Sequence, residues 1–327
     1  MIQIPYKHKF KANHLTKTLF SDEKIINECQ DSTFQNVVNT SNLLIFSAIE
    51  SFNENDFDSF FEIVEKMVSF FDRLYHEESF DIDSIFPEIY NPDFNAYLIY
   101  SINPNFYTPP NIHEVLALIS TISSFPSNFQ FFRNSSIFDI VYNLLELQEP
   151  MVYLECLLLI NQYIVIFQTT EFPYEIPSFL QKLKDISNYS NIIKYIPETL
   201  NLLLIYVDVH KYLDYILSFL NQILNKIQSR HGINDIINSL IYVVKEDPNN
   251  YSRIFQSKII HTFINLLQTY FVPNFDHYQF IILNFFKFLK KSFDKIDYQW
   301  QTKTIKLIGV DTFNLIFDEM KSSKKSF

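Results

Sequence analysis

The apolar positions of the chain recur at the spacing of an α-helix in several long stretches. Between Tyr212 and Gln228 the apolar side chains fall three or four residues apart, and the polar ones fall mostly on the opposite side. The stretch from Phe57 to Leu74 follows the same spacing, with charged residues in the intervening positions. Both patterns predict amphipathic helices.

Other ranges are apolar over more residues than an ordinary strand holds, and they also predict helices. They are Met151–Phe167, Glu198–Val207, Ile233–Lys245, Ile259–Tyr270 and His277–Lys291. Prolines separate these ranges at intervals close to one helix plus a loop: Pro126, Pro150, Pro173, Pro177, Pro197, Pro248 and Pro273. Because proline is accepted in the first turn of a helix and breaks its interior, each predicts a helix start or a junction.

One segment of the chain matches a second segment further along. Residues 128–145 align without a gap to residues 250–267, at an offset of 250 − 128 = 122. The identical pairs are Asn128/Asn250, Ser135/Ser257, Ile137/Ile259, Asn143/Asn265, Leu144/Leu266 and Leu145/Leu267. Three periods of about 41 residues fit this offset, and that length is typical of arrays built from helical repeats.

The matched region resembles repeats of the armadillo and HEAT type. The segment from Ser127 to Leu145 is similar to the second helix of an armadillo repeat, and Met151–Phe167 is similar to its third helix. Asn250–Gln268 followed by His277–Lys291 repeats the arrangement. The small and glycine residues that normally occupy the turns of the family are missing from this chain.

The resemblance implies an all-α fold, an α-solenoid of stacked helical pairs or triplets. We expect an armadillo- or HEAT-like right-handed superhelix of roughly six or seven units. The repeat domain is expected to cover residues 21–320, with the clearest repeats in 110–292 and an acidic part at 50–93. A basic extension at 1–20 and a basic tail at 321–327 flank it.

The chain has only 2 glycines, Gly232 and Gly309, where average usage would give about 23. Phosphate-binding loops, nucleophile elbows and tight hairpins all depend on glycine, so the sequence disfavours a glycine-cradled nucleotide site and a hairpin-rich β-fold. The eight histidines are scattered singly, and neither His76 nor His113 has the second histidine of a zinc-binding helix. We therefore expect no catalytic residues, no cofactor and no metal.

The cysteines and apolar runs bear on where the protein resides. Cys29 and Cys156 are far apart and belong to no CxxC motif, which favours reduced structural thiols. No signal peptide is visible in the first twenty residues, and no apolar run is both long and uninterrupted enough to span a bilayer. We expect a soluble cytoplasmic protein, with a nuclear location as the alternative.

The formal net charge of −11 is concentrated in one stretch of the chain. From Glu50 to Asp93 the sequence has 13 acids and 2 bases, so 13 − 2 accounts for the whole excess. The lack of a basic stripe disfavours nucleic acid as the partner. Acids in this stretch could attract a protein with a basic surface or segment, and the candidates are Asp56, Asp58, Glu62, Glu65, Glu77 and Glu78. The alternative is that they only keep an apolar protein soluble.

Two asparagines are candidates because of the resemblance. In peptide-binding armadillo proteins, asparagines on the third helices hold the backbone of an extended peptide. Asn161 and Asn284 occupy equivalent places in the repeated helices, whereas Asn221 lies 60 residues after Asn161, about one and a half repeats. The single tryptophan, Trp300, joins no array, which disfavours recognition of the importin type.

These observations together predict a non-enzymatic protein-interaction scaffold or adaptor, whose oligomeric state the sequence leaves open. That step rests on the resemblance in fold. Two alternatives from other classes stay open. One is an RNA-binding helical repeat protein, and the other is an enzyme whose site carries no recognisable motif.

Overall fold

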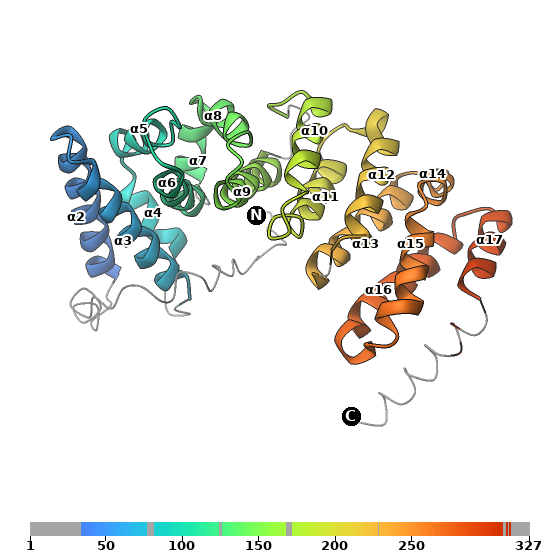
Figure 1. The fold of residues 1–327 in the computed structure, drawn as a ribbon. Helices are drawn as coiled ribbons and strands as arrows, with labels where there is room; N and C mark the ends of the chain where they lie inside the picture. The colour runs from blue at the N-terminus through green and yellow to red at the C-terminus, as the bar shows by residue number, and fades with distance from the viewer. Residues whose placement is uncertain are drawn as a thin grey trace. The chain divides into compact units, whose positions relative to one another are not determined.

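The fold is helical throughout the part of the chain that the structure describes. A computed structural model describes residues 34–76, 82–123, 126–167, 172–227, 229–309, 312 and 314. All regular secondary structure in these ranges is helix, and the helices follow one another with short connections (Figure 1). The prediction of an all-α fold is confirmed.

The chain divides into two compact units, residues 1–137 and 138–327. The sequence analysis expected one continuous repeat domain over 21–320. The boundary between the units falls at the first residues of a helix that begins at Ile137. Each unit has its own buried apolar core.

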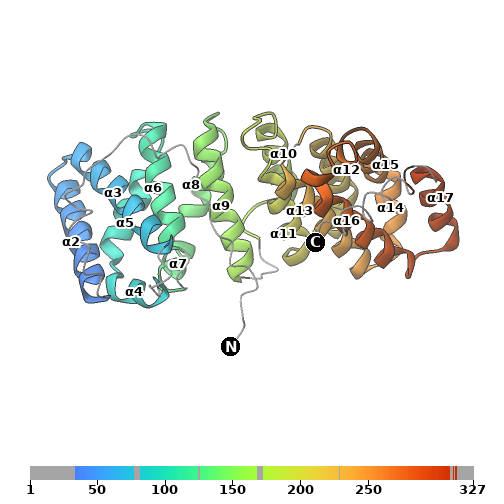
Figure 2. The same ribbon diagram turned by 90° about the horizontal axis from the view of Figure 1, so that it is seen from below.

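Unit 1 contains six described helices, shown in Figure 2. They are α2 (Phe34–Asn53), α3 (Phe57–His76), α4 (Ile82–Ile89), α5 (Pro92–Ser101), α6 (Pro109–Ile122) and α7 (Pro126–Arg133). Helix α2 contacts α3, α4 and α5, helix α3 contacts α6, and α5 contacts α6 and α7. The core between them is fully buried at Ala48, Phe60, Val64, Leu98 and Leu116.

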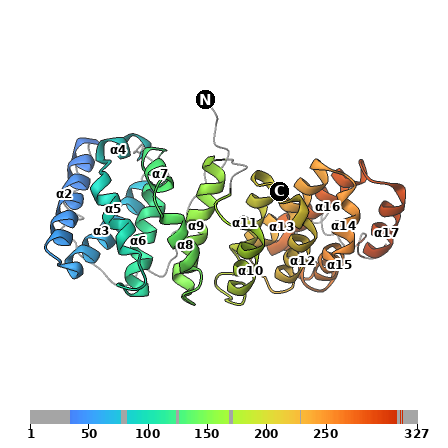
Figure 3. The same cartoon turned by 90° about the horizontal axis from the view of Figure 1, so that it is seen from above.

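The described helices of unit 2 begin with α8 (Ile137–Leu144), α9 (Pro150–Phe167), α10 (Ile176–Ile186), α11 (Ile196–Tyr206) and α12 (Leu213–Leu224). They continue with α13 (Arg230–Glu246), α14 (Asn250–Gln256), α15 (Ile259–Leu266), α16 (Phe275–Phe293) and α17 (Tyr298–Ile308). Helices α9, α11, α13 and α16 contact one another in succession, and α12, α15 and α17 form a second succession of contacts (Figure 3). Unit 2 therefore has two layers of helices.

The prolines act as the sequence predicts at several helix starts. Pro126 and Pro150 are the first residues of α7 and α9, and Pro177 and Pro197 lie in the first turns of α10 and α11. The other predicted junctions, Pro173, Pro248 and Pro273, lie between helices. A proline lacks the backbone N–H that an interior helical residue donates, which explains both placements.

Two predicted helices end earlier than their apolar pattern suggests. The helix expected over Tyr212–Gln228 runs from Leu213 to Leu224, after a short 3₁₀ turn at His210–Tyr212. The helix expected over Ile259–Tyr270 is α-helical only to Leu266 and continues as a π-helical turn at Leu267–Phe271. The N–H of Val272 donates to the carbonyl of Leu267 at 2.9 Å, five residues back, which defines the wider turn.

The two matched segments fold alike, but each forms two short helices where the resemblance implies one. Helices α8 and α15 have bounds that differ by the same 259 − 137 = 122 residues as the sequence offset. In the first copy the Ser135 hydroxyl donates to the carbonyl of Phe132 at 2.6 Å and accepts from the N–H of Ile137 at 3.3 Å.

The second copy repeats both bonds. The hydroxyl of Ser257 donates to the carbonyl of Ile254 at 2.7 Å and accepts from the N–H of Ile259 at 3.4 Å. One serine thus satisfies the end of one helix and the start of the next, which is why the apolar spacing continues across a break in the helix.

Gly232, in the first turn of α13, is a position where the backbone needs glycine because of crowding. A Cβ atom there would lie 2.3 Å from Cδ1 of Ile227 and 2.9 Å from the carbonyl oxygen of Lys194. We expect Gly232→Ala to lower the free energy of unfolding by about 1 kcal/mol, because overpacking by 1–3 kcal/mol outweighs the gain in helix propensity. Urea unfolding followed by circular dichroism measures it.

The control for this prediction removes the crowded neighbour. The double variant Ile227→Ala/Gly232→Ala should lose less stability than the sum of its two single changes, since the shortened Ile227 side chain gives the new methyl group room. Strictly additive losses would show that crowding against Ile227 is not the reason for the glycine.

Candidate functional site

Unit 1 carries a cluster of eight aromatic rings at the end where α2 leads into α3. We define the aromatic cluster by these members: Phe52, Phe57, Phe60, Phe61, Tyr97, Tyr100, Phe106 and Tyr107. Adjacent ring centroids are separated by 4.4 Å at the closest pair, Phe52 and Tyr97, and by 6.4 Å at Phe106 and Tyr107. These are the distances of attractive stacked and edge-to-face pairs.

Local hydrogen bonds hold the cluster in place. The hydroxyl of Tyr97 on α5 donates to Oδ1 of Asn53, the last residue of α2, at 2.8 Å. After α5 the carbonyl of Asn103 accepts from the backbone N–H groups of Phe106 and Tyr107, at 3.1 Å and 3.3 Å. This turn brings Phe106 and Tyr107 back against the rings of α3 and α5.

The outer part of the cluster is open to solvent. Tyr100 is 49% exposed and Phe106 is 63% exposed, and their rings are stacked with centroids 5.8 Å apart. Tyr107 is half-buried beneath them, and its burial, followed by the neighbouring Tyr100 hydroxyl, raises the pKa of its phenol. Two adjacent exposed rings on a packed aromatic base are an apolar surface fixed in position.

The acidic residues predicted on this part of the chain lie on α3 and at its start. Asp58, Glu62 and Glu65 are exposed. At 100° per residue, they lie about 40–100° around the helix from Phe61, on the side away from the core. The acids therefore form a strip beside the aromatic cluster. Glu77 and Glu78 lie outside the residues that the structure describes.

The acids of the strip differ in their surroundings. Glu62 pairs with Lys66 at 2.7 Å, one turn along the helix. Burial raises the pKa of Glu65, and the charges of Glu114 on α6 and of Glu62 raise it further. The pKa of Glu65 therefore indicates negative charge from two helices in the same place.

Asp56 has a structural role at the start of α3. Its carboxylate accepts from the backbone N–H of Ser59 at 3.2 Å, which places it as the cap of the helix. Hydrogen bonds from the hydroxyl and the N–H of Ser59 lower the pKa of this carboxyl. A capped carboxylate stays exposed and charged, so Asp56 still adds to the negative field beside the cluster.

The predicted asparagines lie in unit 2, on helices that belong to one layer. Asn161 on α9 is 6% exposed, and its Oδ1 has no hydrogen-bond partner. Asn284 on α16 is half-buried and donates from Nδ2 to Oδ1 of Asn234 at 2.7 Å. The acids and the asparagines thus belong to different units.

The sequence analysis missed Asn201, which has a stronger positional relation to Asn161 than Asn221 has. It lies 201 − 161 = 40 residues after Asn161, close to one repeat, and on α11, the helix that contacts α9. Its Oδ1 accepts from the hydroxyl of Ser239 at 3.2 Å, in the buried contact between α11 and α13. The period of about 41 residues was the signal that could have found it.

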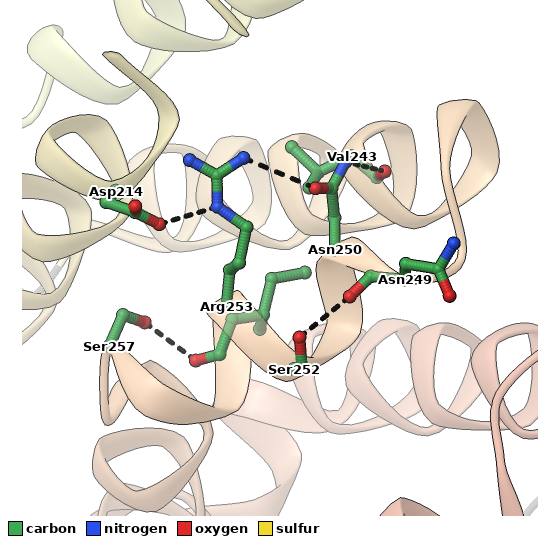
Figure 4. A network of polar contacts seen from close by, with 8 residues as sticks. Asp214, Val243, Asn249, Asn250, Ser252, Arg253 and Ser257 are labelled. Carbon is green, nitrogen blue, oxygen red and sulfur yellow. Dashed lines mark hydrogen bonds and ion pairs between the residues drawn. The ribbon is translucent and has the colours of Figure 1, made fainter. Parts of the chain in front are cut away.

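The matched asparagine Asn250 is part of a structural network, shown in Figure 4. Arg253 on α14 donates from Nε to Asp214 on α12 at 2.7 Å, and from Nη1 to Oδ1 of Asn250 at 3.5 Å. Asn250 in turn donates from Nδ2 to the carbonyl of Val243 on α13, at 3.4 Å. The hydrogen bond and charge of Arg253 lower the pKa of Asp214. The network joins three helices, so the identity of Asn250 with Asn128 has a structural reason.

Unit 2 also holds a carboxyl with a strongly altered acidity. Burial, followed by the charge of Glu198, raises the pKa of Asp235 on α13 from 3.8 to about 7. Cys156 on α9 is a fully buried free thiol, and burial raises its pKa. Within the described ranges no three histidine, cysteine, aspartate or glutamate side chains are grouped so that they could hold a metal ion.

The sequence analysis singled out the acids of α3 and missed the rings beside them. The signal was available, because residues 97–107 carry four aromatic residues in a short space and Phe57 and Phe61 are one turn apart. It was obscured by the abundance of Phe and Tyr along the whole chain, 35 and 20 residues respectively.

Comparisons with known proteins concern only the fold. No protein-family model matches the sequence, and no curated protein matches it. Among solved structures, the chain is similar to the crystal structure of an engineered protein from a structural genomics consortium. The TM-score is 0.55 and the identity 12%, over 76% of this chain and 97% of the engineered one. No described helix is both long and apolar enough to cross a membrane.

Proposed function

We propose that the protein is a non-enzymatic interaction scaffold or adaptor of the armadillo- or HEAT-like α-solenoid type. The successive contacts of α9, α11, α13 and α16, and the matched helix pairs in residues 126–144 and 250–266, support a repeat array in unit 2. Arrays of this kind present extended surfaces on which other proteins bind.

The observation that carries the proposal is the exposed aromatic pair Tyr100 and Phe106 next to the acids of α3. Aromatic side chains supply much of the binding energy of protein interfaces, because they bury a large area and lose few rotatable bonds. Acids at the edge attract a positively charged partner and speed its encounter. A protein with a basic segment fits both features, since lysine and arginine also bind over aromatic rings.

The first experiment captures partners from a native cell extract with the tagged chain and measures each one again with purified proteins. We expect the double variant Phe106→Ser/Tyr100→Ser to weaken binding at least about tenfold, as for an aromatic residue at the centre of an interface. The matched control is Tyr298→Ser on α17, because Tyr298 is 80% exposed and lies in unit 2. Equal loss in both variants would contradict the assignment.

A second set of variants tests the charges. We expect Asp58→Asn/Glu62→Gln/Glu65→Gln to weaken binding at low salt and to matter less near 1 M salt, where charges are screened beyond about 3 Å. The control changes three exposed acids of unit 2, as Asp208→Asn/Glu246→Gln/Asp276→Asn. A partner that binds both unit 1 variants normally and is lost with Asn161→Ala would place the contact in unit 2 and overturn the proposal.

A further inference from the structure

The outer rings of the aromatic cluster form an apolar surface that no described part of the chain covers. Tyr100 and Phe106 are 49% and 63% exposed, and the half-buried Tyr107 lies against both. Exposed apolar surface that is also fixed in position is typical of a docking site. The question is which segment it fits.

The charges around the cluster define the kind of segment. Asp58, Glu62 and Glu65 flank it on α3, and Glu114 of α6 lies near enough to raise the pKa of Glu65. The nearest described base on α3 is Lys66, which is already paired with Glu62. The surface therefore complements a segment that carries both lysines and aromatic residues.

Residues 1–20 of this chain have that composition. They include Lys7, Lys9, Lys11 and Lys17 and no acid, with Tyr6, Phe10 and Phe20 between and after the lysines. This segment is the strongest run of positive charge in the sequence, and it precedes the acidic stretch on the same chain. Charge and apolar character thus both match the surface.

The segment can also reach the cluster. Helix α2 is 20 residues long, about 30 Å, and its last residue Asn53 accepts the hydrogen bond of Tyr97 in the cluster. The chain from Phe20 to Phe34, at the start of α2, spans up to about 46 Å when extended. The length that separates the basic segment from α2 is therefore sufficient.

We propose that residues 1–20 dock on the aromatic cluster and the acids of α3, so that the protein occupies its own binding surface. The inference rests on the proposed function of this surface and adds its regulation. A tethered segment acts at an effective concentration of the order of 1 mM, so it competes with a partner even when its own affinity is weak. A partner with a stronger basic segment displaces it, and the site is then open only to such partners.

The test is hydroxyl-radical footprinting of the full chain, read by mass spectrometry at Tyr100 and Phe106. The comparison is with the full chain carrying Lys7→Gln, Lys9→Gln, Lys11→Gln and Lys17→Gln, in which the charges of the segment are removed. We expect both rings to be oxidised at least about threefold more slowly in the unchanged chain at low salt, as tethering at this effective concentration implies. Tyr298 is the internal reference, because it is 80% exposed and lies in unit 2.

Two further arms complete the test. Protection should stay the same over a tenfold dilution, whereas protection that weakens on dilution would show a second copy of the chain and overturn the intramolecular arrangement. A labelled peptide of residues 1–20 should bind the Lys→Gln chain more tightly than the unchanged chain, in which the site is already filled. Equal oxidation in the two chains, or equal peptide binding, would overturn the inference.

The outcomes separate this inference from the proposed function. If a partner needs Phe106 and Tyr100 while the footprint is equal in both chains, only the self-occupancy is wrong. If the footprint shows protection while no partner depends on these rings, only the scaffold function is wrong.

Discussion

Replacing Asp235 with asparagine should stabilise unit 2 at pH 8 and change its stability little at pH 4. Burial and the charge of Glu198 raise the pKa of this carboxyl to about 7 in the folded protein, against 3.8 for the unfolded chain. Below pH 3.8 the carboxyl is protonated in both states and contributes no pH dependence. Between pH 3.8 and pH 7 the unfolded chain releases a proton that the folded protein keeps, so stability falls as the pH rises.

Above pH 7 the cost is complete, because the folded protein then carries a charge in a largely buried place. The difference between the two pKa values corresponds to a cost of the order of 4 kcal/mol. Asparagine cannot ionise, so we expect Asp235→Asn to recover about 2–4 kcal/mol at pH 8, after the smaller cost of burying an amide. Thermal unfolding at several pH values, followed by the fluorescence of Trp300 in unit 2, measures it.

The variant Glu198→Gln serves as the matched control. It removes the nearby charge and leaves Asp235 in place, and since burial is the larger cause of the raised pKa, the loss of stability should begin at a slightly higher pH and persist. Unfolding midpoints that fall equally with pH in the unchanged chain and in Asp235→Asn would mean that another group determines the pH dependence.

Replacing Tyr251 with alanine should be among the most damaging single changes in unit 2. Its side chain is 0% exposed, and its hydroxyl is 2.9 Å from Oγ1 of Thr304 on α17. Its ring is stacked on Phe288 of α16 with centroids 6.2 Å apart, so one side chain joins α14, α16 and α17. We expect Tyr251→Ala to lower the free energy of unfolding by about 3–5 kcal/mol, the usual cost of removing a buried ring.

A conservative change separates the ring from the hydroxyl. Tyr251→Phe should cost only about 1 kcal/mol, since the Thr304 hydroxyl can still donate to the carbonyl of Trp300 at 2.9 Å. Tyr298→Ala, on an exposed ring of the same unit, should stay within about 0.5 kcal/mol of the unchanged protein. Urea unfolding of the three variants checks these values, and a loss for Tyr251→Phe as large as for Tyr251→Ala would contradict the packing argument.

Much of the helical structure was accessible from the sequence alone. Long apolar runs and helical spacing found α3, α9, α13 and α16 with ends correct to a few residues, because helix burial imposes a period that a single chain displays. The breaks at Ser135 and Ser257 were not found, since the apolar period continues across them and only the hydroxyl hydrogen bonds show where the helices end.

The candidate surface was accessible only in part. The exposed acids of α3 follow from their spacing, whereas the capping role of Asp56 depends on one hydrogen bond to Ser59. The aromatic cluster combines residues from α2, α3, α5 and the turn before α6, so it exists only once tertiary contacts bring residues 52–61 and 97–107 together. Likewise, the acidity of Asp235 depends on burial between helices, which sequence spacing does not reveal.

The succession of contacts in unit 2 has a consequence for how this part of the chain folds. Helix α11 contacts α9 and α13, and α13 contacts α16, so the principal contacts join helices that are close in sequence. Closing the short loops between such helices costs little chain entropy, which favours rapid folding through growth from a local nucleus. During synthesis α9 and α11 can then pair before α16 has been made, and the half-made unit would already protect its apolar surfaces from aggregation.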